Sequence, residues 1–171
     1  MTQFNFCPWC ATSLGRSTRG GRERPTCESC GYIQYRNPVV GVAIVLFEHG
    51  RLLLGRRAFG QDRAGLWCIP CGYVEWGEDI REAARREFLE ETGLDVQPGD
   101  IFAVHSNFHN PTALTVGIWF RGTVVGGNLE AADDLDLVGF FDPANLPGDL
   151  AFPTDVLVIS QAQRELQDLK S

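Results

Sequence analysis

Between residues 79 and 94, apolar and polar positions alternate with the period of an α-helix. At about 100° per residue, one side of such a helix collects two apolar residues and two glutamates. They are Ile80, Ala84, Glu87 and Glu91, with Ala83 and Glu90 at the edge. Arg81, Glu82 and Arg85 face elsewhere, as expected of residues in water. The side that should pack against the protein therefore carries acids.

Three glutamates on a packed helix side, Glu87, Glu90 and Glu91, would repel one another and resist removal from water. Oxygen ligands clustered in this way suit a hard divalent ion such as Mg²⁺, with water completing its shell. The alternative without a metal is a solvent-exposed helix stabilised by Arg–Glu pairs, which is the commoner structure for such sequences. Because the acids coincide with the apolar stripe, we favour the metal site.

The flanks of this helix carry signals that fix its ends. Leu66–Cys71 is an apolar run that predicts a strand, and Gly72–Gly77 predicts a loop. Asp79 can cap the first turn of the helix, and Gly93 can supply the left-handed residue that ends it. Strand, loop, helix and glycine stop would make a rigid frame for an ion.

The rest of the chain predicts further strands and one more helix. A hairpin is expected around Glu48-His49-Gly50, and Gly126-Gly127 reads as a turn. The expected strands are 39–47, 51–55, 101–106, 115–125 and 137–141. Thr154 or Asp155 can cap a last helix. This order predicts a mixed sheet sandwiched between helices.

The segment from Gly72 to Leu94 resembles the Nudix box, and every fixed position of that 23-residue motif is filled. The positions are Gly72, Glu78, Arg86, Glu87, Phe88, Glu90, Glu91, Gly93 and Leu94. The resemblance implies the α/β/α sandwich of Nudix hydrolases. It also implies an enzyme dependent on Mg²⁺ (or Mn²⁺) that cleaves a pyrophosphate linked to a nucleoside or similar group.

By the same resemblance, Glu87, Glu90 and Glu91 hold the metal together with the backbone carbonyl of Cys71, and Arg86 orients a glutamate. Glu78 is expected to be structural. In this family a downstream loop often adds one more carboxylate, as metal ligand or general base. Glu130 and Asp133 are the candidates, and a solvated acidic turn is the alternative.

Two C-x-x-C pairs near the start of the chain predict a structural zinc site. The ligands are Cys7, Cys10, Cys27 and Cys30. Disulfides or free thiols are the alternatives, and disulfides are less favoured because the chain reads as intracellular. We expect a zinc ribbon over residues 1–36 and a Nudix domain over 37–171. Cys68 and Cys71 form a third pair and are expected to be buried, inert thiols, with a redox switch less favoured.

Substrate contacts are expected outside the box. Arg56 and Arg57 directly follow a strand and could reach phosphates. Phe108, in the loop Asn107–Pro111, could stack on a base. The histidines are expected to be surface or packing residues, although His109 lies in a loop that could enter the pocket.

The formal net charge of −7 argues against non-specific binding to nucleic acid or membranes. The basic residues that do cluster are Arg16, Arg19, Arg22 and Arg24; such a loop could touch phosphates, but a solvated turn is favoured. No apolar stretch of the sequence approaches the roughly 20 residues that span a bilayer. We expect a cytoplasmic protein with a small nucleotide as its partner, and a homodimer is left open.

A ribbon followed by this box resembles two branches of the family, the NADH pyrophosphatases and the FAD pyrophosphatase-like enzymes. The segment 104–111 does not match the signature of the NADH branch, so FAD, ADP-ribose and other dinucleotides stay open as substrates. The alternative function is a catalytically idle module that senses a nucleotide or binds a partner through the ribbon. A degenerate box would favour it, and this box is intact.

Overall fold

The computed structural model describes residues 4–168. The chain divides into two compact units, Met1–Pro38 (unit 1) and Val39–Ser171 (unit 2). The sequence predicts the boundary slightly earlier, after residue 36. Within the described residues, neither helix is long and apolar enough to cross a membrane.

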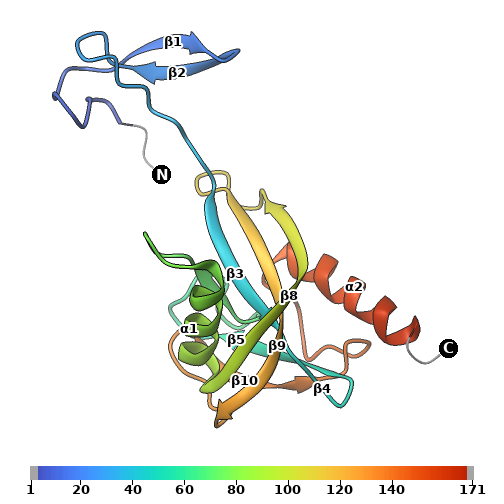
Figure 1. Cartoon of the computed structure of the whole chain (residues 1–171). Coiled ribbons are helices and arrows are strands. Elements are labelled where there is room, and N and C mark those ends of the chain that lie inside the picture. The colour runs from blue at the N-terminus through green and yellow to red at the C-terminus, as the bar shows by residue number, and fades with distance from the viewer. Residues whose placement is uncertain (1–3, 169–171) are drawn as a thin grey trace. The chain divides into compact units, whose positions relative to one another are not determined.

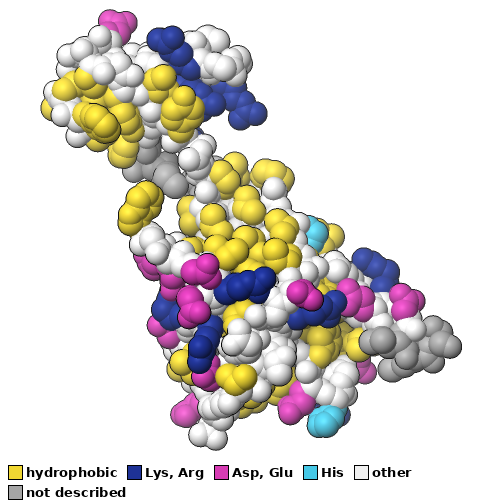
Figure 2. All heavy atoms as spheres, in the orientation of Figure 1, with side chains coloured by type: hydrophobic (Ala, Val, Ile, Leu, Met, Phe, Trp, Pro, Cys, Tyr) yellow, Lys and Arg dark blue, Asp and Glu magenta, His cyan; other side chains and the backbone are white. Residues whose placement is uncertain are grey.

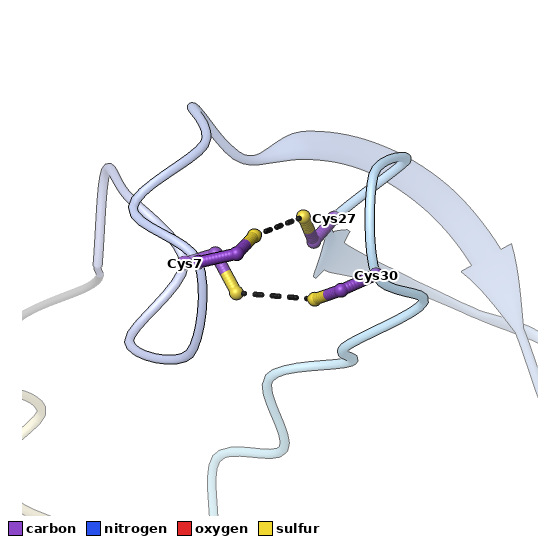
Figure 3. Close-up of side chains that lie close together, drawn as sticks. Cys7, Cys27 and Cys30 are labelled. Carbon is purple, nitrogen blue, oxygen red and sulfur yellow. Dashed lines mark hydrogen bonds between the residues drawn. The ribbon is translucent and has the colours of Figure 1, made fainter.

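Unit 1 is an antiparallel hairpin of β1 (Gly15–Arg19) and β2 (Arg22–Thr26) beside two cysteine-bearing loops. Figure 3 shows the thiols of the two loops pointing toward one another. The Sγ atoms of Cys7 and Cys30 are 3.5 Å apart, as are those of Cys10 and Cys27. All four sulfur atoms lie within 4.8 Å of one another.

This sulfur cluster has the dimensions of a zinc site. Four thiolates bound tetrahedrally at about 2.3 Å from Zn²⁺ are separated by about 3.8 Å. Both cysteine loops turn back in the same way, because the amides of Ala11 and Gly31 donate to the carbonyls of Cys7 and Cys27 at 2.9 Å. Ala11 and Gly31 both have left-handed backbones, with φ of 58° and 77°, respectively. The two loops are equivalent knuckles around one metal position.

Unit 2 contains eight strands and two helices among its described residues. The strands are β3 (Val39–Val45), β4 (Phe47–Glu48), β5 (Arg51–Arg57), β6 (Trp67–Cys68), β7 (Cys71–Tyr73), β8 (Leu94–Asn107), β9 (Thr115–Gly127) and β10 (Leu135–Phe141). The helices are α1 (Ile80–Thr92) and α2 (Pro153–Asp168). One sheet has the order β7-β3-β9-β8, and β3 and β9 run parallel within it. The other has the order β10-β5-β4, with β6 also paired to β5.

The central strand β3 is buried on both faces, which explains its unbroken apolar run. Val42 and Ile44 belong to the core cluster that includes Ala84 and Phe88 of α1. The alternate residue Ala43 belongs to the cluster that includes Val158 of α2. Figure 1 shows the two helices on either side of the strands. The predicted mixed sheet between helices is confirmed.

Helix α1 begins and ends where the sequence predicts. The Asp79 carboxylate accepts hydrogen bonds from the amides of Arg81 and Glu82, at 2.8 and 3.4 Å. Gly93 ends the helix in the left-handed region, with φ of 70°, and its amide donates to the Leu89 carbonyl. A β-branched or bulky residue would be strained at this position.

Two predicted details are wrong. The residues Gly126-Gly127 do not form a separate turn, because β9 continues through them in register with the start of β8. Helix α2 begins at Pro153, so Thr154 and Asp155 lie inside its first turn rather than capping it. Proline is favoured at a first helical position because its missing N–H needs no partner there.

The Asp155 side chain links α2 to the segment between β6 and β7. It is 1% exposed, and its Oδ2 accepts a hydrogen bond from the Ile69 amide at 3.1 Å. Burial raises the pKa of Asp155 from 3.8 to about 7, although the Ile69 amide opposes the shift. An ionised carboxylate at this buried position destabilises the folded state.

We expect purified protein to contain about one zinc per chain, and Cys27→Ser to lose it together with the order of unit 1. Elemental analysis measures the metal, and amide hydrogen exchange of residues 5–36 measures the order. Ser29→Ala, an exposed change in the same loop, should keep both. Full zinc retention by Cys27→Ser would mean that Cys68 or Cys71 supplies a ligand.

We expect Asp155→Asn to stabilise the protein at pH 8 and to have little effect near pH 4. The unfolded chain loses the Asp155 proton above its ordinary pKa of 3.8, whereas the folded chain keeps it until about 7. Stability therefore falls as pH rises between these values, by up to about 4 kcal/mol. The amide variant keeps an oxygen acceptor for Ile69 and lacks this loss. Urea unfolding at pH 4.5, 6 and 8 measures the difference, and a difference independent of pH would contradict the assignment.

Candidate active site

A cavity of about 390 Å³ opens in unit 2 among β3, β7, β9, α1 and the segments that follow β8 and precede β10. Its lining includes acidic side chains of α1 and of the segment before β10. It also includes the neutral polar side chains Asn107, at the end of β8, and Thr154, at the start of α2. One space therefore presents two kinds of chemistry.

Glu91 is the most deeply buried acid of α1, with 1% of its surface exposed. Its Oε2 accepts a hydrogen bond from the Cys71 amide at 2.8 Å. Among the described residues, no arginine, lysine or histidine side chain lies within ion-pair distance of it. Burial raises the pKa of Glu91 to about 8, despite the opposing effect of the Cys71 amide. A buried carboxylate without a cationic partner fits a metal ligand.

Glu87 lies one turn earlier and also lines the cavity. Its carboxyl group packs directly against Gly72, where a Cβ atom would overlap it. A larger residue at this position would displace the Glu87 carboxyl group, because the end of that side chain occupies the space where the Cβ atom would lie. This contact places the Glu87 carboxylate beside the start of the motif.

Arg86 forms a fork that organises the neighbouring acids. Its Nε and Nη2 donate to the two carboxylate oxygens of Glu78 at 2.8 and 2.9 Å, and Nη2 also donates to the Tyr73 carbonyl. Its Nη1 lies 2.9 Å from Glu87 and 3.1 Å from Glu90. The Arg86 hydrogen bonds lower the pKa of Glu78 to about 2, which keeps that acid ionised. Arg86 lies outside the cavity lining, as expected for a residue that positions others.

The three glutamates of the motif are not equivalent. Glu90 is exposed and does not line the cavity, whereas Glu87 and Glu91 do. Of the described His, Cys, Asp and Glu side chains, the four zinc-ribbon cysteines form the one group with ligand atoms within 4.8 Å of one another. The α1 carboxylates do not form a group of this kind.

The acidic segment before β10 docks on the end of α1. The amides of Asn128, Glu130 and Ala132 donate to the carbonyls of Gly93, Thr92 and Glu91, at 3.1, 2.9 and 3.1 Å. These bonds satisfy carbonyls that have no partner within a helix. They also bring Asp133 into the cavity lining, with a left-handed φ of 51°, whereas Glu130 lies outside the lining, and both side chains are exposed.

The two candidate arginines have different surroundings. Arg57 is 7% exposed, lines the cavity and lies 3.3 Å from Asp134, and its Nε donates to the Asp62 carbonyl. Arg56 pairs with Asp136 at 2.7 Å and lies outside the lining. Alternation along β5 separates the two side chains.

The neutral part of the cavity holds polar atoms without partners. The Oδ1 atom of Asn107, the Nδ1 atom of His109 and the Oγ1 atom of Thr154 are buried and have no hydrogen-bond partner among the described residues. Burial also lowers the pKa of His109, which favours the neutral ring. Phe108, between two lining residues, is 71% exposed and outside the lining.

The lining residues that sequence reasoning missed include Asp134, Thr154 and Asp155. A signal for Asp155 was present, because it occupies the apolar stripe of the last helix with Val158 and Ile159 at i+3 and i+4. Asp134 and Thr154 carry no comparable signal.

The thiols of Cys68 and Cys71 lie beside this site. Burial raises the pKa of both well above the ordinary thiol value, and the nearby Glu91 and Asp155 carboxylates add to the effect. Both are therefore neutral thiols, the weakly reactive form.

Comparison with known proteins agrees with these features. Residues 36–159 match the family model described as the NUDIX domain, and residues 5–36 match the model described as Nudix N-terminal, a zinc ribbon. A NUDIX hydrolase structure from Nitrosomonas europaea has a TM-score of 0.79 and 26% identity, and the match covers 96% of this chain and 92% of that one.

Among curated relatives, an ADP-ribose pyrophosphatase of Methanocaldococcus jannaschii is 35% identical over 74% of this chain and 75% of its own length. An NAD-capped RNA hydrolase, NudC, of Chromobacterium violaceum is 32% identical over 97% of this chain. The NudC of Stutzerimonas stutzeri is 26% identical over 86% of this chain. The chain spans only 61% and 51% of the lengths of these two relatives.

Nudix hydrolases work with Mg²⁺ or Mn²⁺, and the four clustered cysteines fit a structural Zn²⁺. The intact motif, the fold and the family models agree. The chain belongs to the Nudix hydrolase family and carries the Nudix zinc ribbon at its N-terminal end.

Proposed function

We propose that the chain is a Mg²⁺- or Mn²⁺-dependent pyrophosphohydrolase that cleaves the diphosphate of a nucleoside diphosphate linked to a second group. The cavity is the observation that supports this proposal. Its lining includes the acids Glu87, Glu91 and Asp133 together with neutral side chains that carry unpartnered polar atoms. A diphosphate with a metal suits the acids, and an uncharged polar group such as a base or sugar suits the neutral side chains.

In this proposal Glu87, Glu91 and Asp133 hold the metal with the Cys71 carbonyl, and Arg86 keeps Glu87 in place. When bound, the metal neutralises charge on the phosphate oxygens and lowers the pKa of a coordinated water. Glu90 and Glu130, predicted as further ligands, lie outside the cavity lining, and we propose that they act on outer waters of the metal. Arg57 faces the cavity and can bind a phosphate oxygen, while Arg56 adds positive charge outside it.

The substrate class follows from the cavity and from the relatives. The relative from M. jannaschii is named for ADP-ribose, which has one nucleoside, a diphosphate and a sugar. The two NudC relatives are named for NAD-capped RNA, whose cap is a dinucleotide attached to a chain. We therefore include ADP-ribose, free dinucleotides such as NADH and FAD, and a dinucleotide at the end of an RNA. A cytoplasmic location and a homodimer stay predictions.

We expect purified protein with Mg²⁺ to release a nucleoside monophosphate from at least one of ADP-ribose, NADH or FAD. Glu91→Gln should lower kcat on that substrate at least about 100-fold, because it removes a charged metal ligand while keeping the size of the side chain. Glu82→Gln, an exposed change near the start of the same helix, is the matched control and should be close to the parent. Chromatography of the nucleotide products measures both variants. Turnover of Glu91→Gln within a few-fold of the parent, with folding intact, would remove Glu91 from the site.

We expect Asn107→Ala to raise KM for the true substrate several-fold while leaving kcat nearly unchanged, because its buried oxygen has no protein partner and faces a binding space. The sequence predicts the same effect for Phe108→Ala, whose exposed ring could stack on a base from outside. Since Phe108 does not line the cavity, we expect the larger rise from Asn107→Ala. Steady-state kinetics of the two variants compare them. A KM unchanged by Asn107→Ala would separate this part of the cavity from substrate.

A further inference from the structure

The hairpin of unit 1 has two faces of different charge. Residues paired directly across antiparallel strands point to the same side. Arg19 is paired with Arg22, and Ser17 with Arg24, so these three arginines share one face. Arg16 and Glu23 belong to the other face. The strand pairing therefore places three of the four hairpin arginines on one face.

The arginines on the two faces also differ in their partners. Arg16 forms an ion pair with Glu23 at 3.1 Å. Arg19, Arg22 and Arg24 have no carboxylate within ion-pair distance among the described residues. Like charges directly opposite one another destabilise a strand pair, so the Arg19–Arg22 pair weakens the hairpin. None of these side chains contacts a cysteine of the zinc cluster through a hydrogen bond.

An exposed aromatic ring lies beside this charge. The Arg24 guanidinium lies 4.6 Å from the ring centroid of Tyr35, and 59% of the Tyr35 surface is exposed. We call Arg19, Arg22, Arg24 and Tyr35 the arginine face. In Figure 2 the dark-blue side chains of unit 1 gather over β1 and β2.

The charge of unit 1 is opposite to that of the rest of the chain. Residues 1–38 contain five arginines and two glutamates, with no lysine or aspartate, which gives a formal charge of +3. Since the whole chain carries −7, residues 39–171 carry −10. A zinc ion with four thiolates contributes about −2 to unit 1, so its positive charge is concentrated on the hairpin.

We propose that the arginine face binds single-stranded RNA, with phosphates on the guanidinium groups and a base stacked on Tyr35. Guanidinium groups bind phosphate oxygens in pairs, and an exposed ring binds an unstacked base without regard to sequence. A five-residue strand is about 17 Å long, which is enough for a few nucleotides. An acidic protein surface would need the arginines but not the exposed ring. The inference extends the proposed function to substrates attached to RNA, but binding itself does not require hydrolysis.

The experiment uses the full chain with its zinc and a fluorescein-labelled RNA of 12 unstructured nucleotides, followed by anisotropy at several salt concentrations. Three phosphate contacts should give a slope of about −2 when the logarithm of the association constant is plotted against the logarithm of the salt concentration. We expect Arg19→Ala with Arg22→Ala to weaken binding at least about 10-fold and to flatten the slope. Tyr35→Ala should weaken binding while leaving the slope nearly unchanged, because stacking releases no counterions.

Arg16→Ala is the matched control, because it removes one arginine from the same hairpin on the opposite face. It should bind RNA within about two-fold of the parent, and all variants should keep their zinc. Equal loss in Arg16→Ala would mean that total charge, not this face, is responsible, and the proposal would fail. It would also fail if inorganic polyphosphate competed as well as RNA and Tyr35→Ala had no effect, or if the arginine variants changed only self-association.

Hydrolysis of the free nucleotide separates this inference from the proposed function. The arginine variants should cleave free ADP-ribose or NADH at the parental rate, since none of these residues lines the cavity. Parental hydrolysis by a chain that does not bind RNA would overturn the inference alone. RNA binding by a chain that hydrolyses no nucleotide would overturn the proposed function alone.

Discussion

The buried carboxylate of Glu91 is the constraint on which the site depends. It accepts the Cys71 amide at 2.8 Å and so joins the last turn of α1 to the first residue of β7. Without a cation it is a desolvated acid with its pKa raised to about 8. Such a group destabilises the fold when it is ionised, and a bound divalent ion would remove that cost. The stability of this region and its affinity for metal are therefore linked.

Helix α1 is held at both ends and along one side, so its acids have little freedom. Asp79 caps its start, the amides of the segment before β10 bind its last carbonyls, and Gly72 admits the Glu87 carboxylate. The Arg86 fork then ties Glu78 to the helix from the loop side. Each contact joins the motif to itself or to the acidic segment, which explains why a local sequence can hold these acids in place.

This locality also explains what could be predicted. The ends of α1, the zinc cysteines and the two-sided burial of β3 follow from caps, spacing and unbroken apolar runs, all of which lie within short windows. The neutral side chains of the cavity could not be found in this way. Asn107 and Thr154 line one cavity only because the fold brings the end of β8 and the start of α2 to it, and neither residue has a distinctive neighbour in sequence. Asp155 was mistaken for a cap because a carboxylate at a helix start is usually one.

The net charge of the chain does not predict the arginine face, because it sums charges that lie too far apart to interact. At physiological salt, exposed charges are screened beyond about 8 Å, so the charge at one face depends on the residues near it and not on the total. The value of −7 therefore describes solubility and long-range repulsion, not the chemistry of a hairpin about 17 Å long. What matters there is the cross-strand register, because a shift of one residue would move Arg19 to the face that holds Glu23. The pairing places three guanidinium groups without a carboxylate partner on one face, and folding alone does not favour the directly opposed Arg19–Arg22 pair.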